Sequence, residues 1–192
     1  MRTTIVVNPD YRQMTRLAET LAGKGVPPEA ECIYRGRNRI YKLAYEGIEV
    51  NIKAFRVPGN IKSYIYGAMT SKARRSYYNS VRLQELGFNV PDPIAYVELH
   101  EGPALKESYY VCRQLHAKDV RLWENMPDNE PLVRAVALEL SRLHKAGVWH
   151  KDFSPGNVLY TGDAASGYKM YLIDVNRMQF GVKSKRSLMD NF

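Results

Sequence analysis

Short runs rich in β-branched and aromatic residues fill the first part of the chain. These runs are typical of strands, and turns containing Gly, Asn or Pro separate them. After a short opening strand at Thr3–Val7, the runs are Cys32–Arg35, Arg39–Tyr45, Ile48–Phe55, Ile94–Leu99 and Ser108–Leu115. We expect the last five to form one antiparallel sheet.

Three other segments carry apolar residues at helical spacing. Asp10–Ala22 ends at Gly23, and Ser71–Leu86 is stopped by Gly87. The third helix follows Pro131, and Gly147 lies just past its end, which is the usual placement of these two residues at helix termini. We expect one helix to pack on the sheet and the third to lead the chain into residue 150.

The change from strand-like runs in the first part of the chain to helical spacing after Pro131 predicts an α+β fold with two lobes. We place a first lobe at residues 1–115, with a leading strand and helix followed by the five-stranded antiparallel sheet and one helix. A hinge and connector follows at residues 116–130. A short second lobe, mainly helical, with one hairpin, occupies residues 131–192.

Composition is that of a folded, soluble protein. Of 192 residues, 45% are hydrophobic and 25% are charged, so disorder is excluded. No run approaches the roughly 18 apolar residues that a membrane helix needs, so we expect the chain to be cytoplasmic. Cys32 and Cys112 lack the paired spacing of metal ligands, and we expect both to be buried free thiols.

The chain is basic, with 28 Lys and Arg against 20 Asp and Glu and a formal net charge of +8. Such a balance favours an anionic partner: a phosphate compound, nucleic acid or an acidic membrane surface. The positive net charge does not distinguish among these three kinds of partner. Basic and aromatic residues do interleave, as in Arg74-Arg75-Ser76-Tyr77-Tyr78, but an amphipathic helix explains that pattern equally well. We therefore do not expect a nucleic acid partner.

The most informative segment is Val148–Tyr160 together with Tyr171–Asp174. It has the order His150-x-Asp152-x-x-x-x-Asn157, followed by Asp174 after a strand. This order resembles the catalytic-loop and metal-loop signature of kinases. A hairpin of Val158–Tyr160 with Tyr168–Ile173 would bring Asn157 and Asp174 together.

Phosphoryl transfer requires mainly positioning and neutralisation of charge, which explains these residue types. Asp152 is suited to accept the proton of an attacking hydroxyl. Asn157 and Asp174 offer hard oxygen ligands for Mg²⁺ beside the phosphates of ATP. The structural alternative is an ordinary turn in which Asp and Asn bond only to their own backbone. We expect His150 to brace the loop through backbone hydrogen bonds.

A matching nucleotide-binding half lies upstream. Val50-Asn51-Ile52-Lys53 agrees at three of four positions with the kinase lysine strand, and Lys53 is our candidate for binding the α- and β-phosphates. The hairpin Arg35, Gly36, Arg37 and Asn38 stands where kinases carry a glycine-rich loop, and we assign these four residues to nucleotide binding as well. A solvated lysine and a solvated basic hairpin tip are the alternatives.

Kinases also pair this lysine with a glutamate on the next helix. The corresponding helix position falls near Tyr78 or Asn79, and neither can form the ion pair. Glu85 is the only acidic residue of that helix, and it lies in the last turn.

Taken together, the chain resembles the lipopolysaccharide kinase family, also called the Kdo kinase family, of the protein-kinase-like superfamily. The resemblance spans about residues 33–180 and rests on five motifs. They are Tyr34-Arg35-Gly36-Arg37-Asn38, Ile52-Lys53, Arg75-Ser76-Tyr77 with Glu85-Leu86-Gly87, Pro91-x-Pro93-Ile94-Ala95-Tyr96, and His150–Asn157 with Ile173-Asp174-x-Asn176-Arg177.

The resemblance implies a protein-kinase-like two-lobed fold and transfer of the γ-phosphate of ATP to a sugar hydroxyl of the lipopolysaccharide inner core. It implies ATP and Mg²⁺ as cofactors and an anionic glycolipid or sugar as acceptor, with peripheral contact at the cytoplasmic face of the inner membrane. The family has further helices after the metal aspartate, whereas this chain ends eighteen residues after Asp174, so we expect an abbreviated second lobe.

Two alternatives stay open. The same catalytic residues serve kinases whose acceptor is a protein serine or a small molecule such as an aminoglycoside or a choline-like alcohol. The other alternative is a pseudokinase or binding module that keeps Asp152 and Asp174 but works by interaction.

Overall fold

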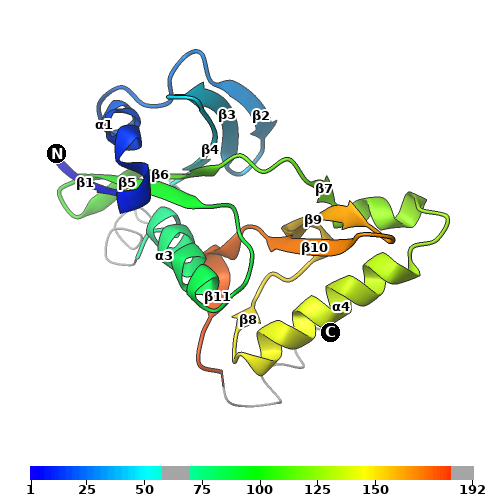
Figure 1. Ribbon diagram of the computed structural model, residues 1–192. Coiled ribbons are helices and arrows are strands. Elements are labelled where there is room, and N and C mark those ends of the chain that lie inside the picture. The colour runs from blue at the N-terminus through cyan, green and yellow to red at the C-terminus, as the bar shows by residue number, and fades with distance from the viewer. Residues whose placement is uncertain (58–69, 183–192) are drawn as a thin grey trace. The chain divides into compact units, whose positions relative to one another are not determined.

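The computed structural model describes residues 1–57 and 70–182 (Figure 1). Backbone contacts divide the chain into two compact units. We call residues 1–81 and 92–114 the sheet unit, and residues 82–91 with those from 115 onward the hairpin unit. The predicted lobe boundaries at 115 and 131 stay a prediction, and residues 183–192 of the predicted second lobe lie outside the described residues.

The sheet unit is built on one antiparallel sheet. Within the described residues it has six strands, in the order β1-β5-β6-β4-β3-β2. They are β1 (Arg2–Val7), β2 (Glu31–Arg35), β3 (Arg39–Tyr45), β4 (Ile48–Phe55), β5 (Pro93–Glu101) and β6 (Ala104–Arg113). The prediction of five strands was wrong, because the opening strand β1 joins the edge of the sheet by pairing with β5 along its whole length.

The two faces of this sheet carry different residues. Cross-strand partners share a face, so Val50 of β4 faces the same way as Leu43 of β3, and Ala54 the same way as Tyr109 of β6. These residues belong to a core that includes Leu17, Leu21 and other residues of α1 (Thr15–Gly23). We call this side the α1 face.

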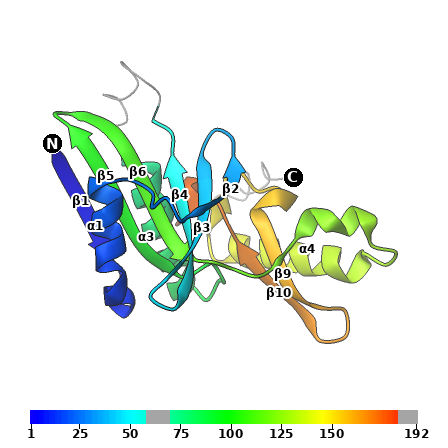
Figure 2. The ribbon, with the colours of Figure 1, turned by 90° about the horizontal axis from the view of Figure 1, so that it is seen from above.

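The opposite side of the sheet packs against α3 (Lys72–Glu85). Phe55, Tyr96 and Tyr110 form a second buried cluster with Ala73 and Tyr77 of the helix. A hydrogen bond of 2.9 Å between Ser80 Oγ and Tyr110 Oη fixes the helix on this α3 face. Figure 2 shows α1 and α3 on opposite sides of the sheet.

Two expectations for this unit were wrong in detail. The leading helix does not run unbroken from Asp10, because the chain first forms a 3-10 segment at Pro9–Met14 in which Tyr11 has non-helical backbone angles. Cys32 is exposed, since every residue of the edge strand β2 is exposed. Cys112 is buried as predicted, and burial raises the pKa of its thiol to about 12.

The hairpin unit packs one long helix on a small hairpin. Helix α4 (Glu130–Lys145) has Pro131 in its first turn and three basic residues in its last, and both placements stabilise helix ends. It buries Leu132, Leu140 and Leu143 on one side. Gly147 follows with a φ of 67°, a left-handed conformation that glycine adopts without steric cost.

The rest of this unit is made of short elements. They are β7 (Lys118–Asp119), a 3-10 turn (Val120–Asn125), β8 (Trp149–His150), a 3-10 turn (Pro155–Asn157), β9 (Val158–Asp163), β10 (Gly167–Leu172), a 3-10 turn (Val175–Arg177) and β11 (Met178–Gln179). The predicted hairpin is present as β9 and β10, which pair from Val158↔Leu172 to Asp163↔Gly167. In the part of the chain that the structure describes, no helix is long and apolar enough to span a membrane.

Candidate active site

The turn after β8 is held in place by His150. The ring is buried, and its Nδ1 accepts a hydrogen bond of 3.2 Å from the backbone N–H of Asp152. Its Nε2 lies 3.3 Å from the carbonyl oxygen of Ile173 and therefore donates to it, which requires the neutral tautomer protonated on Nε2. Burial lowers the pKa of His150, in agreement with a neutral ring. The expected bracing role of His150 is confirmed.

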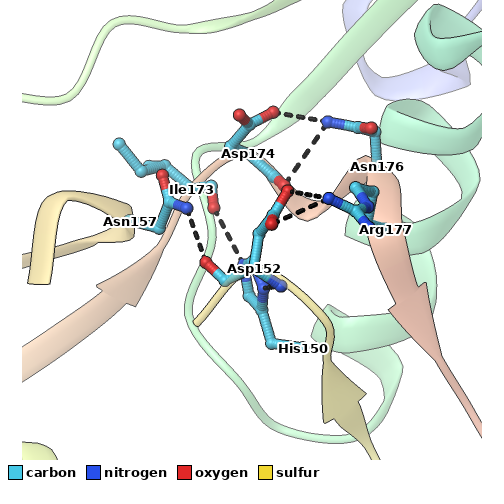
Figure 3. A network of polar contacts seen from close by, with 7 residues as sticks. All are labelled: His150, Asp152, Asn157, Ile173, Asp174, Asn176 and Arg177. Carbon is cyan, nitrogen blue, oxygen red and sulfur yellow. Dashed lines mark hydrogen bonds and ion pairs between the residues drawn. The ribbon is translucent and has the colours of Figure 1, made fainter. Parts of the chain in front are cut away.

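Asn157 connects the turn to the hairpin. Its side-chain Nδ2 donates to the carbonyl oxygen of Asp152 at 2.7 Å, and its own carbonyl oxygen accepts from the backbone N–H of Ile173 at 3.0 Å. Asn157 therefore holds the turn on one side and the end of β10 on the other. Figure 3 shows Asp152, Asn157 and Asp174 from three segments of the chain in one place, with the bond from Asn157 to Asp152 as a dashed line.

Asp174 follows β10 in an unusual backbone conformation. Its φ of 54° and ψ of 40° lie in the left-handed region, which Asp tolerates better than most non-glycine residues. A side-chain oxygen of Asp174 accepts a hydrogen bond from Nδ2 of Asn176, whose side chain is buried. The carboxylate thus has a defined direction set by a neighbour two residues away. Strained backbone of this kind often occurs at functional sites.

Asp152 has an ion-pair partner that the sequence did not suggest. Nη1 of Arg177 lies 2.8 Å from both carboxylate oxygens of Asp152. Both side chains are about half exposed, so the carboxylate is oriented while staying accessible from solvent. The arrangement is visible in Figure 3, where the two side chains point toward each other.

The donors at this site are suited to a hard divalent cation. Asn157 uses its Nδ2 to bind Asp152, and no hydrogen bond reaches its Oδ1 from the described residues. Together with the carboxylate of Asp174 it supplies two oxygen ligands, the type that Mg²⁺ prefers. Among residues 1–57 and 70–182, no group of three or more His, Cys, Asp or Glu side chains is arranged so that it could hold a metal ion.

The sheet unit holds the candidate nucleotide lysine. Lys53 pairs with Tyr110 in the neighbouring strand, so it points to the α3 face of the sheet, with its Nζ 5.3 Å from the centre of the Phe55 ring. Asn51, on the same face, donates to Oε1 of Gln114 at 2.9 Å. Strand β4 thus presents Lys53 on the same face as Asn51, whose side-chain amide is held by its hydrogen bond to Gln114.

The basic hairpin does not share this face as a whole. Arg35 pairs with Arg39, and Arg39 with Ala54, so Arg35 lies on the α1 face, opposite to Lys53. Gly36, Arg37 and Asn38 form the turn between β2 and β3, which is closed by a hydrogen bond of 3.0 Å from Gly36 N to the carbonyl oxygen of Asn38. The structure therefore separates the side chain of Arg35 from that of Lys53.

Helix α3 supplies no early glutamate. Its single acidic residue, Glu85, forms an ion pair of 2.8 Å with Arg82 in the last turn.

Sequence reasoning missed the roles of Asn176 and Arg177. Both stand in the Ile173-Asp174-x-Asn176-Arg177 motif, which marked the family without suggesting contacts. The signal was the position of Asn176 two residues after Asp174, because a polar residue in a tight turn commonly bonds the side chain two residues away. Nothing in the sequence indicates that Arg177 reaches Asp152, twenty-five residues earlier.

Comparison with known proteins agrees with this geometry. The lipopolysaccharide kinase (Kdo/WaaP) family matches residues 49–192. No curated protein matches the sequence.

Among solved structures, WaaP in complex with acyl carrier protein is similar, with 22% identity and a TM-score of 0.65 over 100% of this chain and 78% of that one. The ADP/Mg²⁺-phosphoaspartate complex of Rio2 kinase from Chaetomium thermophilum has 22% identity and a TM-score of 0.61, covering 95% of this chain and 57% of that one. WbdD has 19% identity and a TM-score of 0.55, covering 86% and 36%. These matches confirm the protein-kinase-like fold.

Proposed function

The chain belongs to the lipopolysaccharide kinase (Kdo/WaaP) family, and we propose that this kinase transfers the γ-phosphate of ATP to a sugar hydroxyl of the lipopolysaccharide inner core. The observation that carries the proposal is that hydrogen bonds link Asn157 to the backbone of Asp152 and to the backbone of Ile173, the residue before Asp174. These bonds bring three segments of the chain together, as Figure 3 shows. An oriented carboxylate beside two oxygen ligands is what phosphoryl transfer requires.

In the proposed reaction the acceptor hydroxyl oxygen attacks the γ-phosphorus, and the bond between that phosphorus and the oxygen bridging to the β-phosphate breaks. Asp152 accepts the proton that the hydroxyl loses, and ADP leaves. Arg177 holds the carboxylate in one direction, which leaves lone pairs of both oxygens for the hydroxyl, because an ionised carboxylate has about four acceptor sites. Arg177 is therefore a positioning residue in this proposal.

Asn157 and Asp174 would hold Mg²⁺, which when bound offsets the negative charge of the phosphates. The fixed amide of Asn157 presents its Oδ1 without further rearrangement, since the other end of the amide is already bonded. Lys53 would bind the α- and β-phosphates, and Arg35, Gly36, Arg37 and Asn38 stay our candidates for the nucleotide-covering segment. Of these, the turn residues Gly36 to Asn38 fit best, because Arg35 points to the α1 face.

The acceptor is proposed from charge as well as from family. A net charge of +8 favours approach to an anionic glycolipid and to the anionic surface of the inner membrane, where peripheral binding on the cytoplasmic side would place enzyme and acceptor together.

The nucleotide half of the proposal is tested by thermal unfolding with ATP and Mg²⁺. Because a ligand that binds only the native state raises the melting temperature, ATP with Mg²⁺ is expected to raise it more than ATP alone. Asp174→Asn should abolish the extra effect of Mg²⁺, and Lys53→Met should weaken the effect of ATP itself. An equal shift in wild type and both variants would remove these residues from the site.

The acceptor half is tested by the fate of labelled γ-phosphate. Inner-core lipopolysaccharide, a serine peptide, an aminoglycoside and choline are offered in parallel, with Asp152→Asn as the inactive control. Label on a sugar of the lipopolysaccharide, dependent on Asp152, is the expected result. Label on another acceptor would keep the kinase and change its substrate, whereas no transfer to any of them would favour a binding module.

A further inference from the structure

The α1 face of the sheet unit carries a candidate for a second binding site. A cavity of about 790 Å³ opens there beside the β2–β3 hairpin. Its lining includes five basic residues and one acidic residue among mainly apolar and small ones. The charged members are Arg35, Arg37, Arg39, Arg56, Lys106 and Glu107.

The cavity lies on the side of the sheet away from Lys53. Ala54 and Tyr109 form part of its lining, and these two residues are cross-strand partners on the α1 face. Lys53 precedes Ala54 in the same strand, and successive strand residues point to opposite faces. The side chain of Lys53 therefore points to the opposite face and is not part of the lining, although Phe55 at the end of β4 is.

Within the described residues, no carboxylate neutralises the arginines of the cavity. In the described part of the chain, Arg35, Arg37, Arg39 and Arg56 form no ion pair. All four are exposed, so their side chains are available to a ligand. Four guanidinium groups around one hollow repel each other, and a bound anion relieves that repulsion.

The acidic residue of the cavity is already engaged. The carboxylate of Glu107 accepts a short hydrogen bond from the hydroxyl of Tyr109, two residues along the same strand. Burial and this hydrogen bond raise the pKa of Tyr109, so the hydroxyl keeps its proton. Lys106, in turn, binds Glu101 at 2.6 Å. The four arginines thus dominate the charge that a ligand would meet.

The cavity also has a floor. Val26, Tyr41 and Ala54 are partly buried and pack against the core between the sheet and α1, and Tyr109 is buried in it. The volume falls within the range of about 300–1,000 Å³ that is typical of small-molecule sites. A concave site with an apolar floor and arginines at its rim differs from a flat basic surface, because the low-dielectric wall strengthens the attraction of an anion.

We propose that this cavity binds a ligand carrying phosphate groups, in addition to the nucleotide at Lys53. Gly36 and Arg37, which are candidates for covering the nucleotide, also line this cavity, so the two sites would adjoin at the turn between β2 and β3. Guanidinium groups bind phosphate oxygens through paired, parallel hydrogen bonds, and several of them around one cavity suit an anion with more than one phosphate or with a phosphate on a larger polar body. Such a group occurs both in anionic membrane lipids and in soluble phosphate compounds. Occupancy of the site does not depend on catalysis.

The test measures binding of inorganic pyrophosphate by calorimetry. The variant Arg39→Gln/Arg56→Gln removes two charges from the cavity, and the control Arg12→Gln/Arg16→Gln removes two charges from exposed positions before and within α1, in the same unit. Pyrophosphate binding is expected to weaken roughly tenfold or more in the first variant, because two charge-assisted contacts are lost, and to stay unchanged in the control. Lys53→Met should retain this binding.

The source of the ligand is identified by a second probe. Sedimentation with vesicles of phosphatidylcholine and phosphatidylglycerol is compared with pyrophosphate binding. If only vesicle binding depends on Arg39 and Arg56, the ligand is a lipid headgroup. If only pyrophosphate binding depends on them, the ligand is a soluble phosphate compound. If binding of both probes depends on them, the site recognises the phosphate group that the two ligands share.

Three results overturn the proposal. They are no binding of either probe, binding of both probes that is equal in the cavity variant and the control, and loss of pyrophosphate binding in Lys53→Met while neither probe depends on Arg39 and Arg56. The single variant Arg56→Gln, at an exposed position just after β4, repeats the measurement if the double variant unfolds. None of these outcomes depends on ATP turnover, so failure of this site and failure of the proposed kinase activity are distinguishable.

Discussion

Replacing Arg177 by Gln should impair catalysis while leaving the fold almost as stable as before. The substitution removes the guanidinium that lies 2.8 Å from both oxygens of Asp152. A matched control exists in the same unit, since Nη1 of Arg142 lies 2.5 Å from a carboxylate oxygen of Glu139. Both substitutions remove a guanidinium group from an ion pair with a carboxylate, and Arg142→Gln also removes contacts of Arg142 with Gly87 and Phe88.

The expected losses of stability differ because the partners differ in burial. The side chains of Arg177 and Asp152 are 54% and 46% exposed, and pairs exposed to this extent contribute about 0.5 kcal/mol. Glu139 is only 7% exposed, so Arg142→Gln leaves a buried carboxylate without its partner. That variant should lose about 2 kcal/mol, the usual cost of an unsatisfied buried polar group.

The losses of activity should follow the opposite order, with a larger loss in Arg177→Gln than in Arg142→Gln. Without Arg177 the carboxylate of Asp152 samples other directions, and misplacement of a catalytic group costs roughly tenfold or more in kcat. The KM for ATP should stay constant, because Arg177 contacts only the proposed base among the site residues drawn in Figure 3. Arg142→Gln should keep wild-type kcat at temperatures where it is folded.

The assay pairs urea unfolding with steady-state turnover for wild type, Arg177→Gln, Arg177→Lys and Arg142→Gln. Arg177→Lys is expected to recover part of kcat, since a lysine keeps the charge but not the planar geometry. The reasoning is refuted if Arg177→Gln costs as much stability as Arg142→Gln, or if its kcat equals that of the wild type.

Three further predictions concern stability. Leu143→Ala, at a fully buried position of α4, should reduce the free energy of unfolding by about 3 kcal/mol in urea titrations, and a loss below about 1 kcal/mol would mean that the core is not packed as described. Burial lowers the pKa of His150 below its ordinary 6.5, so as the pH falls the unfolded state takes up a proton before the folded state does. The free energy of unfolding should therefore fall as the pH drops below 6.5 and level off below the pKa of the folded state. His150→Gln should reduce this dependence of the free energy of unfolding on pH. Gly162→Ala, at a φ of 82°, would make the new Cβ clash with the carbonyl oxygen of Gly167 and should cost at least about 2 kcal/mol, whereas Gly47→Ala, with a φ of 74° and open space around it, should cost about 1 kcal/mol. Calorimetric melting of both variants compares these losses of stability, and equal losses would contradict the clash.

Local signals predicted the hairpin unit well. Pro131 and Gly147 mark the ends of α4 because each has a backbone preference that acts within one turn of the helix. The turn after β8 and the β9–β10 hairpin were predicted because the residues that shape each of them are neighbours in sequence. Asn157 and the end of β10 are joined by a backbone hydrogen bond, as the predicted hairpin requires.

Contacts between distant segments could not be predicted in the same way. The pairing of β1 with β5 joins Val7 to Ala95, and no property of either strand alone specifies that partner. The exposure of Cys32 follows from the position of β2 at the edge of the sheet, which is decided by the order of the strands. The face on which Arg35 lies depends on the register of β2 with β3, and a shift of one residue would reverse it.

The central claim is that Asp152 acts as the base in transfer of phosphate from ATP. The most direct measurement is a single-turnover experiment with saturating ATP, Mg²⁺ and inner-core lipopolysaccharide, comparing wild type with Asp152→Asn after equal nucleotide binding has been established for both. We predict that the variant binds ATP as the wild type does and transfers phosphate roughly a hundredfold or more slowly, the usual contribution of a general base. Equal transfer rates for the two proteins would contradict the account.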